Sequence, residues 1–208
     1  MPLLSKDSGP GLRWLLFLQG CQRPCTTTCL NPHFLNAKGG ALMEMRELSV
    51  IAGQVAVGTW GDVEGVTVLG GEPTDQAKAL EPLLSYVREL GLSVMLYSGN
   101  PMRWFYQPEN EAARRLLDVS DILVDGPFLS ELANPELRWR GSRNQRIIRL
   151  TARYSVADLE SEMLNRGVTL RIASRTSATV SGLQERSQAR AVELQVRDLA
   201  RGLQSNRR

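Results

Sequence analysis

The chain lacks several features that mark common classes of protein. No apolar run is long enough to cross a bilayer, and the first residues do not combine the charged and apolar segments of a secretory signal peptide. There are only three cysteines, an odd number that cannot all pair in disulfides. We therefore expect a cytoplasmic protein in a reducing compartment, with no membrane partner.

Excess charge is also scarce over most of the sequence. The 208 residues carry a formal charge of +3. Residues 184–208 contain six arginines against three acidic residues, so residues 1–183 are neutral overall. Nucleic-acid-binding domains usually spread positive charge over a surface, so we expect no nucleic-acid partner. We predict a main domain over 1–183 and a basic, amphipathic helical tail over 184–208, most simply a solvated helix.

Short apolar segments alternate with segments of helical spacing. Strands are predicted at 13–19, 65–69, 92–97 and 122–125, and helices at 45–57, 75–90 and 111–117, the last two with Asp75 and Asn110 as N-caps. Shorter strands are predicted at 146–150, 169–173 and 179–181, the last two as a hairpin, and further helices at 157–165 and 186–203. Buried strands that alternate with helices favour an α/β fold with a mostly parallel sheet.

The first four predicted strands end in polar or glycine-rich residues. These ends are Gly20-Cys21, Gly70-Gly71-Glu72, Ser98-Gly99 and Asp125-Gly126-Pro127. In parallel sheets, functional residues collect at the carboxyl ends of the strands. We therefore predict a site that is built from four separate loops, on a half barrel or a fuller barrel.

The first of these loops holds every cysteine of the chain. Cys21, Cys25 and Cys29 lie within the stretch GCQRPCTTTCLNP, residues 20–32. Three thiolates on a 4Fe–4S cluster would leave one iron open to a small molecule. A zinc ion is an equal alternative from this loop alone, because His33, the single histidine, continues the four-residue spacing and could complete a Cys₃His site.

Further stretches occur in a recognisable order. With the cysteine loop, the sequence resembles the radical S-adenosylmethionine superfamily, most closely the activating proteins of anaerobic ribonucleotide reductase and other glycyl radical enzymes. The resemblance covers about residues 5–182 and rests on Ser8–Arg13, Phe17–Cys21, Cys29–Pro32, Leu69–Pro73, Met95–Gly99, Asp121–Phe128 and Trp139–Arg146.

The resemblance implies a fold, two cofactors and a set of site residues. The fold would be a partial (β/α) barrel of the radical S-adenosylmethionine type with a C-terminal helix. The three cysteines would hold a 4Fe–4S cluster, and the amino and carboxylate groups of S-adenosylmethionine would chelate its open iron. Gly70, Gly71 and Glu72 would meet the methionine amino group, since glycine lets backbone approach a ligand closely. Ser98 would donate to the ligand, and Thr28 stands where the family has an aromatic residue near the adenine.

The resemblance also implies a reaction and its partners. The enzyme would reductively cleave S-adenosylmethionine to a 5′-deoxyadenosyl radical and generate a glycyl radical on an enzyme similar to anaerobic ribonucleotide reductase. Flavodoxin or ferredoxin would supply the electron, and no catalytic residue beyond the cluster ligands is implied.

Two features differ from the family pattern and keep other functions open. The spacing is C-x₃-C-x₃-C rather than C-x₃-C-x₂-C, and Thr28 replaces the aromatic residue. One alternative is a 4Fe–4S electron-transfer or accessory protein without radical chemistry. Others are a radical enzyme acting on a small molecule or peptide, and a structural zinc module.

Overall fold

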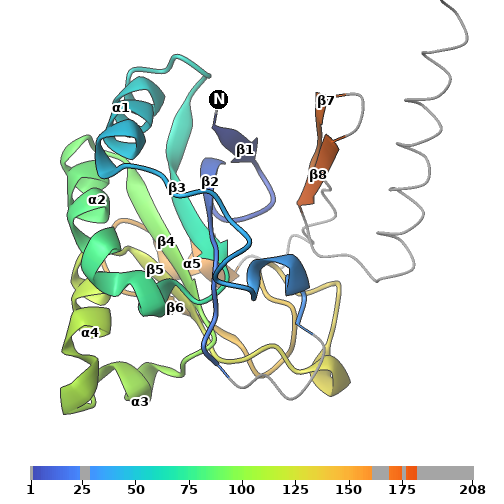
Figure 1. Cartoon of the computed structure of the whole chain (residues 1–208). Helices are drawn as coiled ribbons and strands as arrows, with labels where there is room; N and C mark the ends of the chain where they lie inside the picture. The colour runs from blue at the N-terminus through green and yellow to red at the C-terminus, as the bar shows by residue number, and fades with distance from the viewer. Residues whose placement is uncertain (1, 24–28, 161–168, 175–176, 182–208) are drawn as a thin grey trace, which may run out of the picture.

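A computed structural model describes residues 2–23, 29–160, 169–174 and 177–181 of the chain (Figure 1). Cys25, Thr28 and the predicted tail over 184–208 lie outside these residues. The main body is a mixed α/β structure around a six-stranded sheet, which confirms the predicted α/β class with a mostly parallel sheet. Its strands are β1 (Leu3–Ser5), β2 (Leu12–Leu18), β3 (Val63–Gly70), β4 (Ser93–Ser98), β5 (Ile122–Asp125) and β6 (Arg146–Arg149).

The strands follow one another across the sheet in chain order. The four strands from β2 to β5 are parallel neighbours, whereas β1 and β6 pair antiparallel at the two edges. Over the described residues the sheet is open, because no pairing joins β1 to β6. The short strand β1 was not predicted, since three residues are too few for a periodic signal.

Helices cover one face of this sheet, where α1, α2 and α4 lie side by side (Figure 1). The helices are α1 (Met45–Ala56), α2 (Ala77–Glu89), α3 (Met102–Phe105), α4 (Glu111–Asp118) and α5 (Val156–Glu160), with 3₁₀ turns η1 (Pro32–Phe34), η2 (Pro73–Gln76), η3 (Pro108–Asn110) and η4 (Ser130–Leu132). The short α3 was not predicted. None of the helices in the described part of the chain is long and apolar enough to span a membrane.

The parallel strands are apolar on both faces because both faces are covered. Alternate residues of β4 face opposite ways: Val94 and Leu96 pack in the core beneath the helices. Met95, between them, packs on the other face with Trp139 and Tyr154, from the chain on either side of β6. Two covered faces explain the nearly continuous apolar runs of the sequence.

The predicted helix start at Asp75 is wrong. The helix α2 begins at Ala77, after the 3₁₀ turn η2 that Pro73 opens. Glu72 caps this turn, and its side chain accepts from the backbone N–H of Thr74 at 3.1 Å. The cap is Glu72 rather than Asp75 because Pro73 follows it, and the fixed φ of proline suits the first position of a helical turn. Asn110 does occupy the N-cap position of α4, but its amide donates to the carbonyl of Trp104 at 2.8 Å.

Beyond β6, two further segments are described. The strands β7 (Thr169–Ser174) and β8 (Ser177–Ser181) form an antiparallel hairpin, as predicted. The helix predicted at 157–165 is present as α5 up to Glu160, and its remaining residues lie outside the described part.

A buried arginine lies at the amino end of the parallel strands. Arg13 is fully buried and donates to the hydroxyl of Thr67 at 3.1 Å, to the carbonyl of Val66 at 2.6 Å and to Ser93. Burial lowers the pKa of Arg13, because water no longer solvates its charge. Its hydrogen-bond donors are therefore matched by acceptors from two neighbouring strands.

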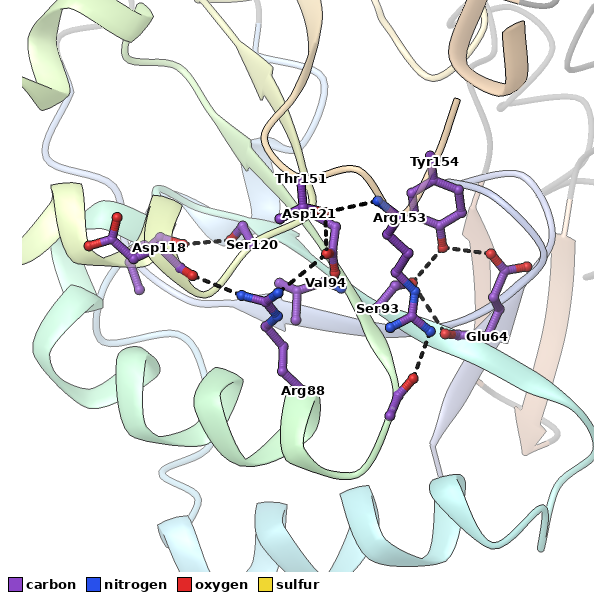
Figure 2. A network of polar contacts seen from close by, with 12 residues as sticks. Glu64, Arg88, Ser93, Val94, Asp118, Ser120, Asp121, Thr151, Arg153 and Tyr154 are labelled. Atoms are coloured by element: carbon purple, nitrogen blue, oxygen red, sulfur yellow. Dashed lines mark hydrogen bonds and ion pairs between the residues drawn. The ribbon is translucent and has the colours of Figure 1, made fainter. Parts of the chain in front are cut away.

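Ser93, which accepts from Arg13, belongs to a wider polar network at the same end of the sheet, and Figure 2 shows this network around Ser93, Tyr154 and Asp121. Tyr154 donates to Glu64 at 2.5 Å and contacts the hydroxyl of Ser93 at 2.7 Å. Asp121, 1% exposed, accepts from the backbone N–H of Val94 at 2.9 Å and from a threonine after β6. These bonds link residues up to 90 positions apart and fix the amino end of the sheet.

Candidate functional site

The predicted convergence of four loops is present at the carboxyl end of the sheet. Cys21 follows β2, Glu72 follows β3, Ser98 ends β4 and Asp125 ends β5. Because these four strands are parallel neighbours, the loops that follow them lie along one edge (Figure 1). The strand register pairs Ser98 directly with Asp125.

The cysteine loop leaves β2 and returns beside its own start. The backbone N–H of Gly20 donates to Phe34 at 2.8 Å, and that of Cys21 donates to Leu35 at 3.2 Å. The rings of Phe17 and Phe34 stack with centroids 4.8 Å apart. The loop is therefore closed at its base, and Cys21 lies just beyond the carboxyl end of β2.

The two described cysteines of this loop, Cys21 and Cys29, are both half-buried. The backbone N–H of Asn31 lies 3.3 Å from the sulfur of Cys29, in position to donate a weak hydrogen bond to it. Hydrogen bonds to cysteine sulfur influence the reduction potential of an iron–sulfur cluster. This loop thus has the ligand chemistry and the backbone donor that such a cluster uses.

The glycine pair after β3 brings the next loop against this one. A Cβ on Gly71 would lie 1.9 Å from the carbonyl oxygen of Gly20. Gly70 has a φ of +113°, a conformation that other residues rarely adopt. The backbone N–H of Glu72 then donates to Gly20 at 2.9 Å. The glycines therefore permit close packing of two loop backbones, and this packing places Glu72 beside the cysteine loop.

Glu72 is 2% exposed, and its carboxylate accepts hydrogen bonds from neighbouring loops. One oxygen accepts from the hydroxyls of Ser98 at 2.9 Å and Thr74 at 2.8 Å. The other accepts from the backbone N–H of Gly99 at 2.9 Å. The sequence placed Glu72 and Ser98 in one site but did not predict that they bond to each other.

Asp125 is buried at the end of β5 and binds an arginine. Its carboxylate accepts from the guanidinium of Arg146, at 2.9 Å for the first oxygen, and from the backbone N–H of Met102 at 2.7 Å. The hydrogen bond to Asp125 raises the pKa of Arg146. Asp125 therefore ties the end of β5 to β6 and to the start of α3.

The segment before β6 wraps around the same turn. Gln145 donates to the carbonyl of Gly126 at 3.1 Å, and Asn144 donates to that of Pro127 at 2.7 Å. A Cβ on Gly141 would lie 2.7 Å from a methyl group of Leu30, in the cysteine loop. The segment over 139–146 is therefore part of the wall of the site.

Buried polar atoms without a hydrogen-bond partner concentrate in these loops. Among the described residues they are Nε of Arg23, Nε of Arg140, Oδ1 of Asn144 and Nε1 of Trp139. Such atoms are uncommon in folded proteins and often face a ligand or ordered water. Sequence reasoning missed Arg23 and Arg140, and also Asn100, which the side chain of Arg23 contacts. Their positions in loops that follow strands were the available signal.

The described residues include no group of three histidine, cysteine or acidic side chains that could hold a metal ion. His33 is exposed and does not form such a group with Cys21 and Cys29. A cavity of about 510 Å³ lies near the amino end of the strands, and Trp139 is the one residue of the 139–146 segment among its lining residues. Its lining residues include Lys6, Gly11 and Asp62.

Comparison with known proteins agrees with this geometry. Residues 8–148 match the model of the 4Fe-4S single cluster domain family. The anaerobic ribonucleoside-triphosphate reductase-activating protein of Vibrio cholerae is 30% identical over 149 residues, 69% of this chain and 92% of that protein. The protein of the same name from Enterobacteria phage T4 is 29% identical, over 67% of this chain and 85% of its own length. The pyruvate formate-lyase-activating enzyme of Streptococcus mutans is 37% identical over 42% of this chain and 34% of its own length.

An open α/β sheet with a cysteine loop on its first parallel strand, together with these matches, defines an iron–sulfur protein. The chain belongs to the radical S-adenosylmethionine family of activating proteins. It is an enzyme of the type that activates glycyl radical enzymes, and its cofactors are a 4Fe–4S cluster and S-adenosylmethionine.

Proposed function

We propose that this protein cleaves S-adenosylmethionine reductively and uses the product to generate a glycyl radical on a partner enzyme. One observation carries the proposal: the cysteine loop packs directly against the Gly70-Gly71-Glu72 loop, through the 2.9 Å bond from Glu72 to Gly20. Ligands for iron and acceptors for an ammonium group therefore come from adjacent strands of one sheet edge.

Each site residue has a role under this proposal. Cys21, Cys25 and Cys29 ligate the cluster. The backbone of Gly70 and Gly71, with the carboxylate of Glu72, binds the amino end of S-adenosylmethionine, and Ser98 helps to orient that carboxylate, to which it already donates at 2.9 Å. Thr28 lies near the adenine, where it contributes a methyl group and a hydroxyl but no ring.

The chemistry belongs to the cofactors, and the chain positions them. When bound and reduced, the cluster supplies the electron that splits S-adenosylmethionine into methionine and a 5′-deoxyadenosyl radical, which takes a hydrogen atom from the partner. The loops keep the ligand in one orientation and exclude water from it. We also propose that the open sheet is a partial barrel within a domain over 1–183, and that the segment over 184–208 is a helical tail.

The proposed partner is an enzyme similar to anaerobic ribonucleotide reductase. This is the enzyme that the relatives from Vibrio cholerae and phage T4 are named for activating. A backbone glycine on a partner loop is a suitable substrate, because an open sheet leaves the carboxyl end of its strands accessible to a protein segment. A low-potential donor such as flavodoxin or ferredoxin supplies the electron.

The test is cofactor cleavage in the absence of oxygen. Purified protein reconstituted with iron and sulfide, reduced and given S-adenosylmethionine, should release 5′-deoxyadenosine and methionine. The variant Cys29→Ser should bind less iron and release neither product. Cys29 is only half-buried and serine is close to it in size, so we expect the variant to fold. Addition of an anaerobic ribonucleotide reductase should then give the EPR doublet of a glycyl radical.

Two results would contradict the proposal. A fully loaded, reducible cluster whose EPR spectrum does not respond to S-adenosylmethionine would support the electron-transfer alternative. Zinc in place of iron after anaerobic purification would support the structural module.

A further inference from the structure

The cysteine loop has two arms, and they are anchored by different means. The first arm continues β2, so the position of Cys21 is set by the sheet through Gly20. The second arm runs from Cys29 through the turn η1 to Asn36 and contains no strand that could anchor it. The position of Cys29 therefore depends on the contacts of this arm with the first arm and with the segment over 139–146.

One side chain makes two of these contacts. The amide nitrogen of Gln19 donates to the carbonyl of His33 at 3.0 Å and to that of Asn36 at 2.7 Å. Both amide hydrogens are therefore used. Their acceptors lie on either side of Phe34 and Leu35, the residues that bond to the start of the first arm. Gln19, at the start of the first arm, is thus bonded to two residues of the second arm.

The surroundings of Gln19 are shaped to hold it there. Its backbone carbonyl accepts from the side chain of Gln76 at 2.9 Å, which ties it to the turn η2. A Cβ on Gly40 would lie 2.7 Å from the Cβ of Gln19, and one on Gly39 would lie 3.0 Å from its amide nitrogen. Two successive glycines therefore leave the space that this side chain occupies.

The chemistry of the position selects glutamine. Two backbone carbonyls require two N–H donors from one group, which a carboxamide provides and a carboxylate does not. Methionine has a similar length but no donor, and asparagine is one carbon shorter.

We propose that Gln19 is a positioning residue that holds the arm bearing Cys29 in register with the arm bearing Cys21, and so sets the relative placement of the cluster ligands. The inference rests on the proposed function, because it assumes that these cysteines bind a cluster. Gln19 does not contact the cluster in this account; it acts through the carbonyls of His33 and Asn36.

The experiment compares Gln19→Met with Gln76→Met in the reconstituted holoenzyme. Gln76→Met is the matched control, since it removes one bond to the same residue but leaves both bonds between the arms. The readouts are the rate of iron loss to a chelator, the EPR spectrum of the reduced cluster, its midpoint potential and the thermal unfolding temperature.

Gln19→Met should lose iron roughly five- to tenfold faster than wild type, the factor expected when one or two hydrogen bonds are lost. Its EPR signal should split into more than one species, with a changed midpoint potential. Gln19→Glu, which presents oxygens to the same carbonyls, should lose iron at least as fast. Gln76→Met should stay within about twofold of wild type, and the unfolding temperatures should agree within a few degrees.

Other results separate the two proposals. If the wild-type protein holds a cluster and Gln19→Met shows the same iron loss and the same spectrum, this inference alone is overturned. Equal acceleration by Gln19→Met and Gln76→Met would also overturn it, because it would indicate general loosening. A wild-type protein that takes up no iron would overturn the proposed function and this inference together.

Discussion

Buried polar side chains occur at both ends of the parallel sheet, but their hydrogen bonding differs between the two ends. At the amino end, Arg13 and Tyr154 are buried and hydrogen-bonded to partners on neighbouring strands. At the carboxyl end, Glu72 and Asp125 are equally buried, but the loops around them contain the unpartnered polar atoms of Arg23, Arg140 and Asn144. The polar groups around Arg13 are matched to one another, whereas some in the loops at the carboxyl end have no hydrogen-bond partner among the described residues.

This difference shows why burial alone does not identify a site. Arg13 is the more unusual residue, since fully buried arginines are rare, yet its network is complete and fits a structural role. The end that we propose to be functional is marked by glycine backbone contacts, two half-buried cysteines and incomplete hydrogen bonding. We expect changes at the amino end to affect stability, and changes at the carboxyl end to affect cofactor binding as well.

The largest effect on stability should come from Arg13→Met. Removing the guanidinium leaves the acceptors of Thr67, Ser93 and Val66 without their donor, and each acceptor left unsatisfied in the interior costs about 1–3 kcal/mol of unfolding free energy. Chemical denaturation of the protein measures it. The matched control is Arg114→Met, whose exposed ion pair with Asp118 at 3.6 Å should contribute less than about 1 kcal/mol. Equal losses for both variants would contradict the structural role of Arg13.

Glu72→Gln should have the next largest effect, and it should change function too. The NH₂ group of the new amide would face the N–H of Gly99 or the hydroxyl of Ser98, which donate to the carboxylate of Glu72. We therefore expect a loss of about 1.5–3 kcal/mol in stability. We also expect S-adenosylmethionine to lose most of its effect on the EPR spectrum of the reduced cluster.

Glu64→Gln is the control at the other end of the same strand. It lies in β3, bonds to Tyr154 and should lower stability while leaving the response to S-adenosylmethionine unchanged. If Glu64→Gln weakened that response as much as Glu72→Gln does, the functional distinction between the two ends would fail.

Tyr154→Phe should cost about 1–2 kcal/mol by removing hydrogen bonds to Glu64 and Ser93, and it should alter the pH dependence of stability. Burial, with the bond to Glu64, raises the pKa of Tyr154 above its ordinary value of 10.0. The unfolded chain therefore loses this proton first, so the contribution is complete below about pH 10 and declines as the pH rises through the higher folded pKa. Denaturation curves from pH 8 to 11 should show a smaller decline in Tyr154→Phe than in wild type.

The smallest effect on stability should come from Asp75→Asn. Asp75 is exposed and accepts from the backbone N–H of Gln22 at 2.8 Å, a bond that the oxygen of asparagine can retain. Stability should change by less than about 0.5 kcal/mol. The midpoint potential should become less negative, because a negative charge beside the cysteine loop is removed. Asp62→Asn, an exposed acid at the amino end, should leave the potential unchanged in the same redox titration.

Local pattern was enough to predict most of the fold. The strands β2 to β5 and the helices α1, α2 and α4 agree with the predicted ranges to within about two residues at most ends. Apolar periodicity and the glycines that follow each strand act over short distances, so they can be read from neighbouring residues. The same local signals placed Cys21, Glu72, Ser98 and Asp125 at one edge of the sheet.

Contacts between distant residues could not be predicted in this way. Arg146 and Asp125 are 21 positions apart, Glu72 and Ser98 are 26 apart, and Tyr154 and Glu64 are 90 apart. Each pair depends on strand register and on the path of a loop, which no single stretch of sequence specifies.

By itself, then, the amino-acid sequence determined the class of fold, the order of the strands' polar ends and the presence of three clustered thiols, because these follow from composition and short-range spacing. Only the tertiary structure decided which polar groups bind one another and which are left without a partner. Hydrogen bonding is short-ranged and directional, so it is settled when the strands have packed and their loops have met.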